Sequence, residues 1–73
     1  MKLVEYKRGT LLYSPWKNTS LMDENYIILR FIEVGEFLFY LKRAHPHSRY
    51  MEVMTPTGET GFVLDTRLKE LSS

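Results

Sequence analysis

The apolar residues of this sequence fall in short runs, and turn-forming residues separate one run from the next. No run keeps an apolar stripe at helical spacing over three turns, whereas a strand needs only a few residues of alternating character. The pattern therefore predicts an all-β fold of five to six strands. We expect the strands at residues 9–14, 26–32, 36–42, 49–54 and 60–64, with a short last strand at 68–71.

Glycine and proline mark the segments between these runs. Gly35 and Gly58 supply the positive φ of a tight turn, and Pro46 and Pro56 preset a turn dihedral, so these segments are typical of hairpins. The polar segment 14–25 is longer. We expect it to be a loop that can present side chains to a ligand.

The length of 73 residues allows one domain, which we place over residues 1–73. A chain this short buries only about 60% of the surface that its unfolded form exposes, so it is marginally stable alone. The absence of cysteine excludes a disulfide and a thiolate zinc site. A partner chain is therefore the expected source of additional stability.

The charges are nearly balanced, with ten basic and nine acidic residues and a formal net charge of +1. Such a balance builds no large field to attract nucleic acid or acidic lipid. The first eight residues carry charges where a signal peptide needs an apolar run, which predicts a cytoplasmic protein. The longest apolar runs are far shorter than the roughly 20 residues that cross a bilayer, so we expect no membrane span.

Segment 61–71, GFVLDTRLKEL, resembles the closing segment of SH3 domains, where a glycine and two apolar residues lead through one 3₁₀ turn into a short last strand. Segment 29–39 resembles the diverging turn of that family, and Leu12 and Tyr13 match its apolar-aromatic pair. The resemblance implies an SH3-like barrel with a 3₁₀ turn before the last strand. Free-standing barrels of this size also resemble accessory proteins of bacteria and phages, which dock on host or virion machinery.

The proline-peptide groove of SH3 domains is not retained. Tyr13 fits the first groove aromatic, but the family's tryptophan is replaced by Arg49 or Tyr50. Leu64 stands in place of the groove proline, and Arg67 in place of the tyrosine of the 3₁₀ turn. A groove with these residues loses most of its stacking surfaces, so proline-rich peptides are not the expected ligands.

Two predicted strands, 26–32 and 36–42, carry apolar residues on both faces, whereas a strand with one wet face should alternate. Strong barrel curvature could bury both faces, but exposed apolar faces also mark interaction sites. We therefore predict a non-catalytic adaptor or regulator that binds another protein, or a second copy of itself, through an apolar strand face and a tryptophan loop. The residues predicted to bind the partner are Tyr13, Trp16, Phe37, Phe39 and Tyr40.

The sequence contains few motifs typical of catalytic, metal or phosphate-binding sites. His45 and His47 lie two residues apart in a turn without a fixed third ligand, and no glycine-rich phosphate loop occurs. The sequence thus predicts no enzyme, metal, cofactor or small-molecule substrate. Nucleic-acid binding by a small β-barrel is the alternative, because barrels of this kind stack bases beside basic side chains. The residues for this alternative are Arg30, Lys42, Arg43, Arg49 and Tyr50, with Tyr40 as a second stacking residue.

Overall fold

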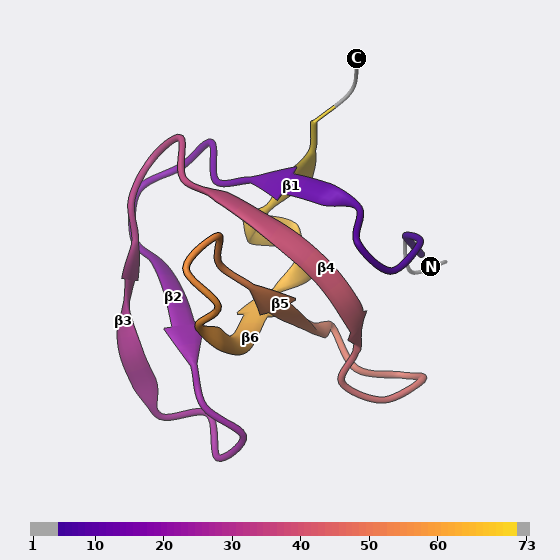
Figure 1. The fold of residues 1–73 in the computed structure, drawn as a ribbon. Coiled ribbons are helices and arrows are strands. Elements are labelled where there is room, and N and C mark those ends of the chain that lie inside the picture. The colour runs from indigo at the N-terminus through magenta and orange to yellow at the C-terminus, as the bar shows by residue number, and fades with distance from the viewer. Residues whose placement is uncertain (1–4, 72–73) are drawn as a thin grey trace.

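The computed structural model describes residues 5–71 and shows one antiparallel sheet of seven strands, in the order β3-β2-β6-β5-β4-β1-β7 (Figure 1). Residues 1–4 and 72–73 lie outside the described part. The cytoplasmic prediction rested on the first eight residues, so half of that segment is not described. The elements are β1 (Leu11–Tyr13), β2 (Thr19–Met22), β3 (Ile28–Ile32), β4 (Phe37–Arg43), β5 (Tyr50–Met54), β6 (Thr60–Leu64), the 3₁₀ turn η1 (Asp65–Arg67) and β7 (Lys69–Glu70).

The all-β prediction is confirmed, but the sheet has seven strands where five to six were expected. The additional strand is β2, which lies inside the segment 14–25 that was expected to be a loop. Thr19 and Leu21 are buried while Ser20 and Met22 are half-buried, so β2 does alternate. Its four residues begin with two hydroxyl side chains, and this is too short and too polar a run to predict a strand from sequence.

The core lies on the inner face of the curved sheet. In β5 and β6 every second residue points inward, so Met51, Val53 and Val63 are fully buried. β4 contributes Leu38 and Tyr40 in the same way. The complete set of buried apolar residues is Leu12, Leu21, Ile32, Leu38, Tyr40, Met51, Val53, Val63 and Leu68.

Gly61 of β6 allows β2 to pack closely on the sheet. A Cβ atom at this position would lie 2.7 Å from Cδ1 of Leu21 and 2.9 Å from the carbonyl oxygen of Met22. Both separations are below van der Waals contact, so any larger side chain would push β2 away. Because β2 contacts the rest of the sheet through β6, Gly61 also fixes the position of β3.

The turn between β2 and β3 is organised by Asp23. Its Oδ1 accepts hydrogen bonds from the backbone N–H groups of Asn25 and Ile27, at 2.8 and 3.0 Å. Tyr26 takes a φ of 61° in this turn, and its ring lies 4.7 Å from the ring of Tyr50 on β5. The turn is thereby attached to the outer side of the sheet, and the residues after it lie at the molecular surface.

Candidate protein-binding surface

Strand β3 stands at one end of the sheet order and, within residues 5–71, pairs only with β2 (Figure 1). Four apolar residues in or next to this strand are about half exposed or more: Ile27 at 61%, Ile28 at 50%, Leu29 at 49% and Phe31 at 58%. We call these four residues the β3 edge surface. Edge strands usually carry charges or proline that block further pairing, and an apolar edge is a template for another strand.

A bulge explains why so many residues of β3 are exposed. Ile28 pairs with Met22 and Arg30 pairs with Leu21, so Leu29 is an extra residue without a partner across the strand pair. An inserted residue interrupts the alternation of faces and bends the strand. Leu29 therefore joins Ile28 and Phe31 at the surface instead of entering the core.

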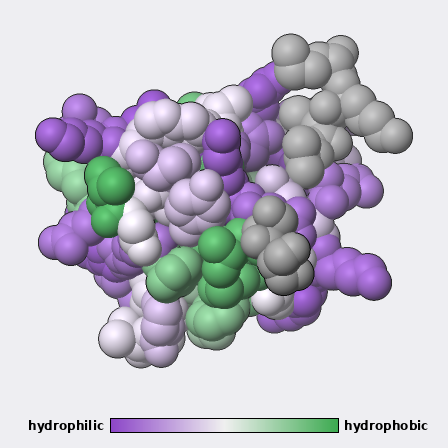
Figure 2. Space-filling view, turned by 90° about the horizontal axis from the view of Figure 1, so that it is seen from above, coloured by the Kyte–Doolittle hydropathy of each residue, from purple (hydrophilic) through white to green (hydrophobic). Residues whose placement is uncertain are grey.

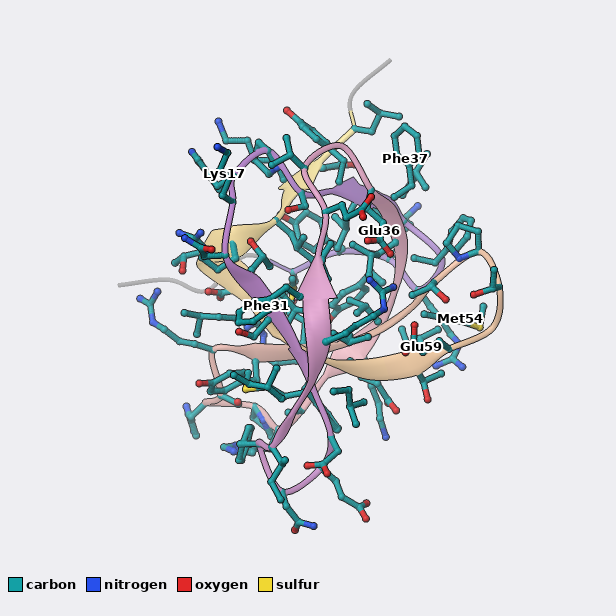
Figure 3. All side chains as sticks on the ribbon, turned by 90° about the vertical axis from the view of Figure 1, so that its left-hand side faces the viewer. Lys17, Phe31, Glu36, Phe37, Met54 and Glu59 are labelled. Atoms are coloured by element: carbon teal, nitrogen blue, oxygen red, sulfur yellow. The ribbon has the colours of Figure 1, made fainter. Side chains whose placement is uncertain are left out.

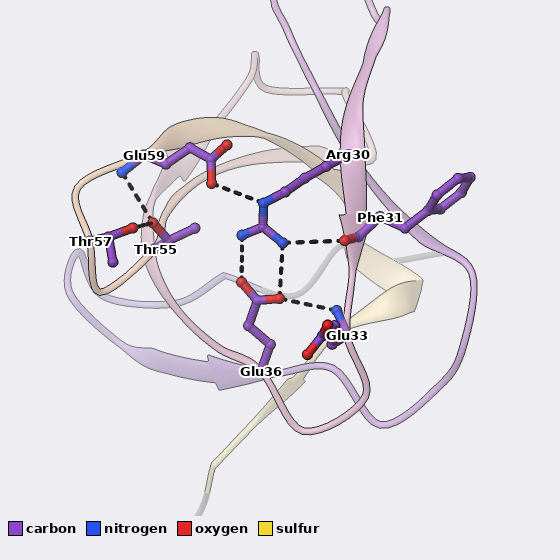
Figure 4. A network of polar contacts seen from close by, with 7 residues as sticks. All are labelled: Arg30, Phe31, Glu33, Glu36, Thr55, Thr57 and Glu59. Atoms are coloured by element: carbon purple, nitrogen blue, oxygen red, sulfur yellow. Dashed lines mark hydrogen bonds and ion pairs between the residues drawn. The ribbon is translucent and has the colours of Figure 1, made fainter.

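Arg30 is the only charged residue of β3, and acidic groups hold its side chain on the sheet (Figure 4). Its Nη1 and Nη2 atoms lie 3.0 and 2.5 Å from the two carboxylate oxygens of Glu36, and Nε lies 3.0 Å from Oε1 of Glu59. Nη1 also donates to the carbonyl oxygen of Phe31 at 3.2 Å. The Phe31 ring extends away from this network, so the side chains of Arg30 and Phe31 leave β3 in different directions (Figure 4).

The network keeps both partners charged. Hydrogen bonds from Arg30 lower the pKa of Glu36, although partial burial acts in the opposite direction. Glu36 also accepts a hydrogen bond from the backbone N–H of Glu33 at 3.0 Å. Glu36 in turn raises the pKa of Arg30. Arg30 therefore links β3 to the β3–β4 turn and, through Glu59, to the turn before β6.

Three of the predicted partner-binding residues lie together on the outer face of β1 and β4. Tyr13 pairs with Phe37, and Leu11 pairs with Phe39, which is also opposite Met54 of β5. Phe37 is 45% exposed, while Tyr13 and Phe39 are half-buried. Figure 3 shows Phe37 and Met54 on one side of the molecule, away from Phe31. This outer face is a second apolar area, less exposed than the β3 edge surface.

Tyr40 was predicted to bind a partner, and the structure places it in the core instead. It is 6% exposed, and its ring meets the Tyr6 ring edge-on at a centroid distance of 5.5 Å. The alternation of β4 directs Tyr40 inward together with Leu38. Burial around this pair raises the pKa of Tyr6. Tyr40 therefore belongs to the core and exposes only a small part of its side chain.

Trp16 lies in the loop before β2 and is 42% exposed. The guanidinium of Arg67 and the ammonium of Lys69 lie 5.8 and 5.4 Å from the ring, within the range of cation–π contacts. Arg67 also donates a hydrogen bond to the carbonyl oxygen of Lys17. The loop is thus held to η1 and β7, and Trp16 stands at the surface among basic groups.

The residues predicted for nucleic-acid binding are largely engaged within the protein. Arg30 is held by two carboxylates, and Arg43 lies 3.2 Å from Asp65 with only 9% of its side chain exposed. Arg49 lies 3.8 Å from the same carboxylate, and the ring of Tyr50 is covered by Tyr26. Lys42 is exposed and pairs across the strands with Glu52.

Sequence reasoning found the region of the β3 edge surface but not its residues. The apolar character of both faces of segment 26–32 indicated exposed apolar residues in this segment, and the structure shows them. The preference of interfaces for large aromatics then directed the choice to Phe37, Phe39 and Tyr40. Ile27, Ile28, Leu29 and Phe31 were missed because neither the edge position of β3 nor the bulge is visible in the sequence.

Other classes of site find little support in the described part of the chain. Among residues 5–71, no three histidine or acidic side chains gather as a metal site would require. None of the described residues forms a helix with the length and apolarity to span a membrane. The face seen in Figure 2 shows separate hydrophobic patches bordered by hydrophilic side chains.

Comparison of the chain with protein-family models, curated proteins and solved structures finds no match.

Proposed function

We propose that the protein is a non-catalytic protein–protein interaction module that binds its partner through the β3 edge surface. The observation that carries this proposal is an edge strand, paired on one side only, that exposes Ile28, Leu29 and Phe31 by about half or more of their area. Apolar surface of this kind is concentrated at interaction sites, where it is removed from water.

The energetics favour association at this strand. Burial of even a few hundred Å² of apolar surface contributes several kcal/mol at about 25 cal/mol per Å², before the costs of association. That contribution is comparable with the whole expected stability of a domain this small. The charge that could protect the edge, Arg30, is directed to Glu36 and Glu59 instead.

We further propose that the fold is an SH3-like barrel. Two features support this assignment: η1 directly precedes the short last strand, and β1 lies between that strand and β4 in the sheet order. The proposed binding surface is on β3, whereas the residues that replace the proline-peptide groove in sequence, Tyr50, Leu64 and Arg67, line a hollow with Ser20 and Met22 of β2. An interaction role thus does not depend on retention of that groove.

Protein binding is preferred to nucleic-acid binding because of where the charges lie. Arg30 and Arg43 form ion pairs with Glu36, Glu59 and Asp65, and a phosphate would have to displace these carboxylates. The exposed residues of β3 are aliphatic and aromatic, and Arg30, the basic residue of that strand, is held by Glu36 and Glu59. Such a surface suits an apolar partner.

Affinity capture with a matched pair of variants tests the function. Leu29 on β3 and Leu71 after β7 are the same residue type with similar exposure, 49% and 46%, at opposite ends of the sheet. We expect the wild-type chain and Leu71→Ser to retain the same partner protein and Leu29→Ser to lose it. A partner that all three retain equally would contradict the proposal. Urea unfolding of each variant controls for stability, since exposed substitutions change it by about 0.5 kcal/mol or less.

A further inference from the structure

The charge of this small protein is unevenly distributed along the chain. Segment 19–36, which contains β2, β3 and the turns that follow them, has four acidic residues and one basic residue, a net charge of −3. The whole chain has a net charge of +1, so the remaining residues together carry +4. The hairpin that bears the β3 edge surface is therefore the acidic part of a slightly basic protein.

The acidic groups border the apolar strand at both ends. Glu24 is exposed in the turn before β3, and Glu33 is exposed directly after it. Arg30, the one basic residue between them, is already shared by Glu36 and Glu59. A molecule that approaches β3 from its free edge thus meets an apolar centre with a negative charge at each end.

This pattern disfavours a second copy of the chain as the occupant. Two copies of β3 paired antiparallel about a two-fold axis would bring the Glu24 end of one strand beside the Glu33 end of the other. The like charges would repel at both ends of the pair, and repulsion of this kind selects against a partner.

We propose that the partner presents an extended segment with an apolar centre and lysine or arginine at both ends, which adds to β3 as a further strand of the sheet. This inference rests on the proposed function and specifies its partner. Backbone hydrogen bonds along the free edge would supply affinity, and side chains of the segment would contact Ile28, Leu29 and Phe31. The basic ends would face Glu24 and Glu33 and give the interaction its charge selectivity.

Synthetic peptides of about ten residues, a typical strand length with charged ends added, test the inference on the full chain. The first has the centre Val-Thr-Ile-Thr-Val-Thr with Lys-Arg at each end, and the second has the same centre with Glu-Asp at each end. Fluorescence anisotropy measures binding of the labelled peptides. We expect the basic peptide to bind at least about tenfold more tightly than the acidic one, with an affinity that falls as salt screens the charges.

Two N-methylated versions of the basic peptide test strand addition directly. One is methylated at the odd-numbered amides and the other at the even-numbered amides, so each loses the donors along one edge only. We expect one version to bind like the parent peptide and the other to lose binding by about tenfold or more. Equal binding of both versions would overturn strand addition.

Variants of the protein complete the test and separate the inference from the function on which it rests. Glu24→Lys with Glu33→Lys should reverse the preference from the basic to the acidic peptide, and Leu29→Ser should weaken both peptides while Leu71→Ser changes neither. Preference for the acidic peptide by the wild-type chain would overturn the inference. Absence of peptide binding, together with loss of the captured partner in Leu29→Ser alone, would overturn the inference but keep the function.

Discussion

The guanidinium of Arg30 and the carboxylate of Glu36 form a bidentate ion pair, with Nη1–Oε1 and Nη2–Oε2 distances of 3.0 and 2.5 Å. The pair joins β3 to the start of β4 across the tight turn that contains Gly35. Because Arg30 also bonds Glu59, one side chain fixes the hairpin to two turns of the sheet. The β3 edge surface is held in place by contacts made on the other side of the strand.

Replacement of Glu36 by glutamine should loosen this attachment. The variant loses the charge and one of the paired hydrogen bonds, which should lower the free energy of unfolding by about 1 to 2 kcal/mol. Urea unfolding measures the effect. Glu33→Gln is the matched control on the same turn, because its exposed side chain should change stability by about 0.5 kcal/mol or less. Equal effects of the two variants would contradict a structural role for the ion pair.

The same pair predicts an acid-dependent loss of stability. Hydrogen bonds from Arg30 hold the pKa of Glu36 below its ordinary value, so the folded state binds this proton more weakly than the unfolded state does. The contribution is therefore complete above the ordinary glutamate range near pH 4 and is lost as the pH falls through the lowered pKa. Wild-type stability should decline more steeply than that of Glu36→Gln over this range. Parallel curves of unfolding free energy against pH would count against the shift.

Gly61→Ala should displace β2 from β6. The added methyl would meet Leu21 and the backbone of Met22 at less than 3 Å, and overpacking of this kind costs about 1 to 3 kcal/mol. Thermal unfolding measures the loss, and amide exchange should rise in residues 19–32. Gly58→Ala provides a contrast, since its cost would arise from a φ of 91° in a turn and not from contact with β2. An unchanged melting temperature for Gly61→Ala would refute the close packing.

Thr19→Val should stabilise the protein. The Thr19 side chain is fully buried at the start of β2, and its hydroxyl has no hydrogen-bond partner among residues 5–71. Valine has nearly the same shape and removes the unsatisfied polar group, so we expect a gain of about 1 kcal/mol in the free energy of unfolding. Ser20→Ala, on the outward side of the same strand, controls for a general change in strand propensity. Destabilisation by Thr19→Val would show that the hydroxyl is satisfied in solution.

Much of this fold is predictable from local sequence, because strands such as β5 and β6 alternate cleanly and glycine or proline marks the turns beside them. The turn η1 lies where the resemblance of segment 61–71 to the closing segment of SH3 domains implied one. β2 was missed because it owes its conformation to pairing with β3 and to the space left by Gly61. Neither the pairing with β3 nor the space above Gly61 can be recognised from the residues of β2 alone.

The proposed binding surface depends on features that the sequence alone does not reveal. Two-faced apolar strands correctly indicated surplus apolar surface, but whether a residue is core or surface depends on strand order. Tyr40 and Phe31 both alternate within apolar strands, and one is 6% exposed while the other is 58% exposed. The difference arises because Tyr40 faces the core from β4, whereas Phe31 lies on the outer side of β3, whose residue on the core side is Ile32.

The most direct test of the account is amide hydrogen exchange of the full chain, free and with the basic peptide or a captured partner protein bound. We predict protection concentrated in residues 27–32, because a strand added to β3 would engage its free backbone groups. The β1 and β4 segments around Tyr13 and Phe37 and the loop around Trp16 should exchange as in the free protein. Protection of those segments, with β3 unchanged, would contradict the β3 edge surface as the binding site.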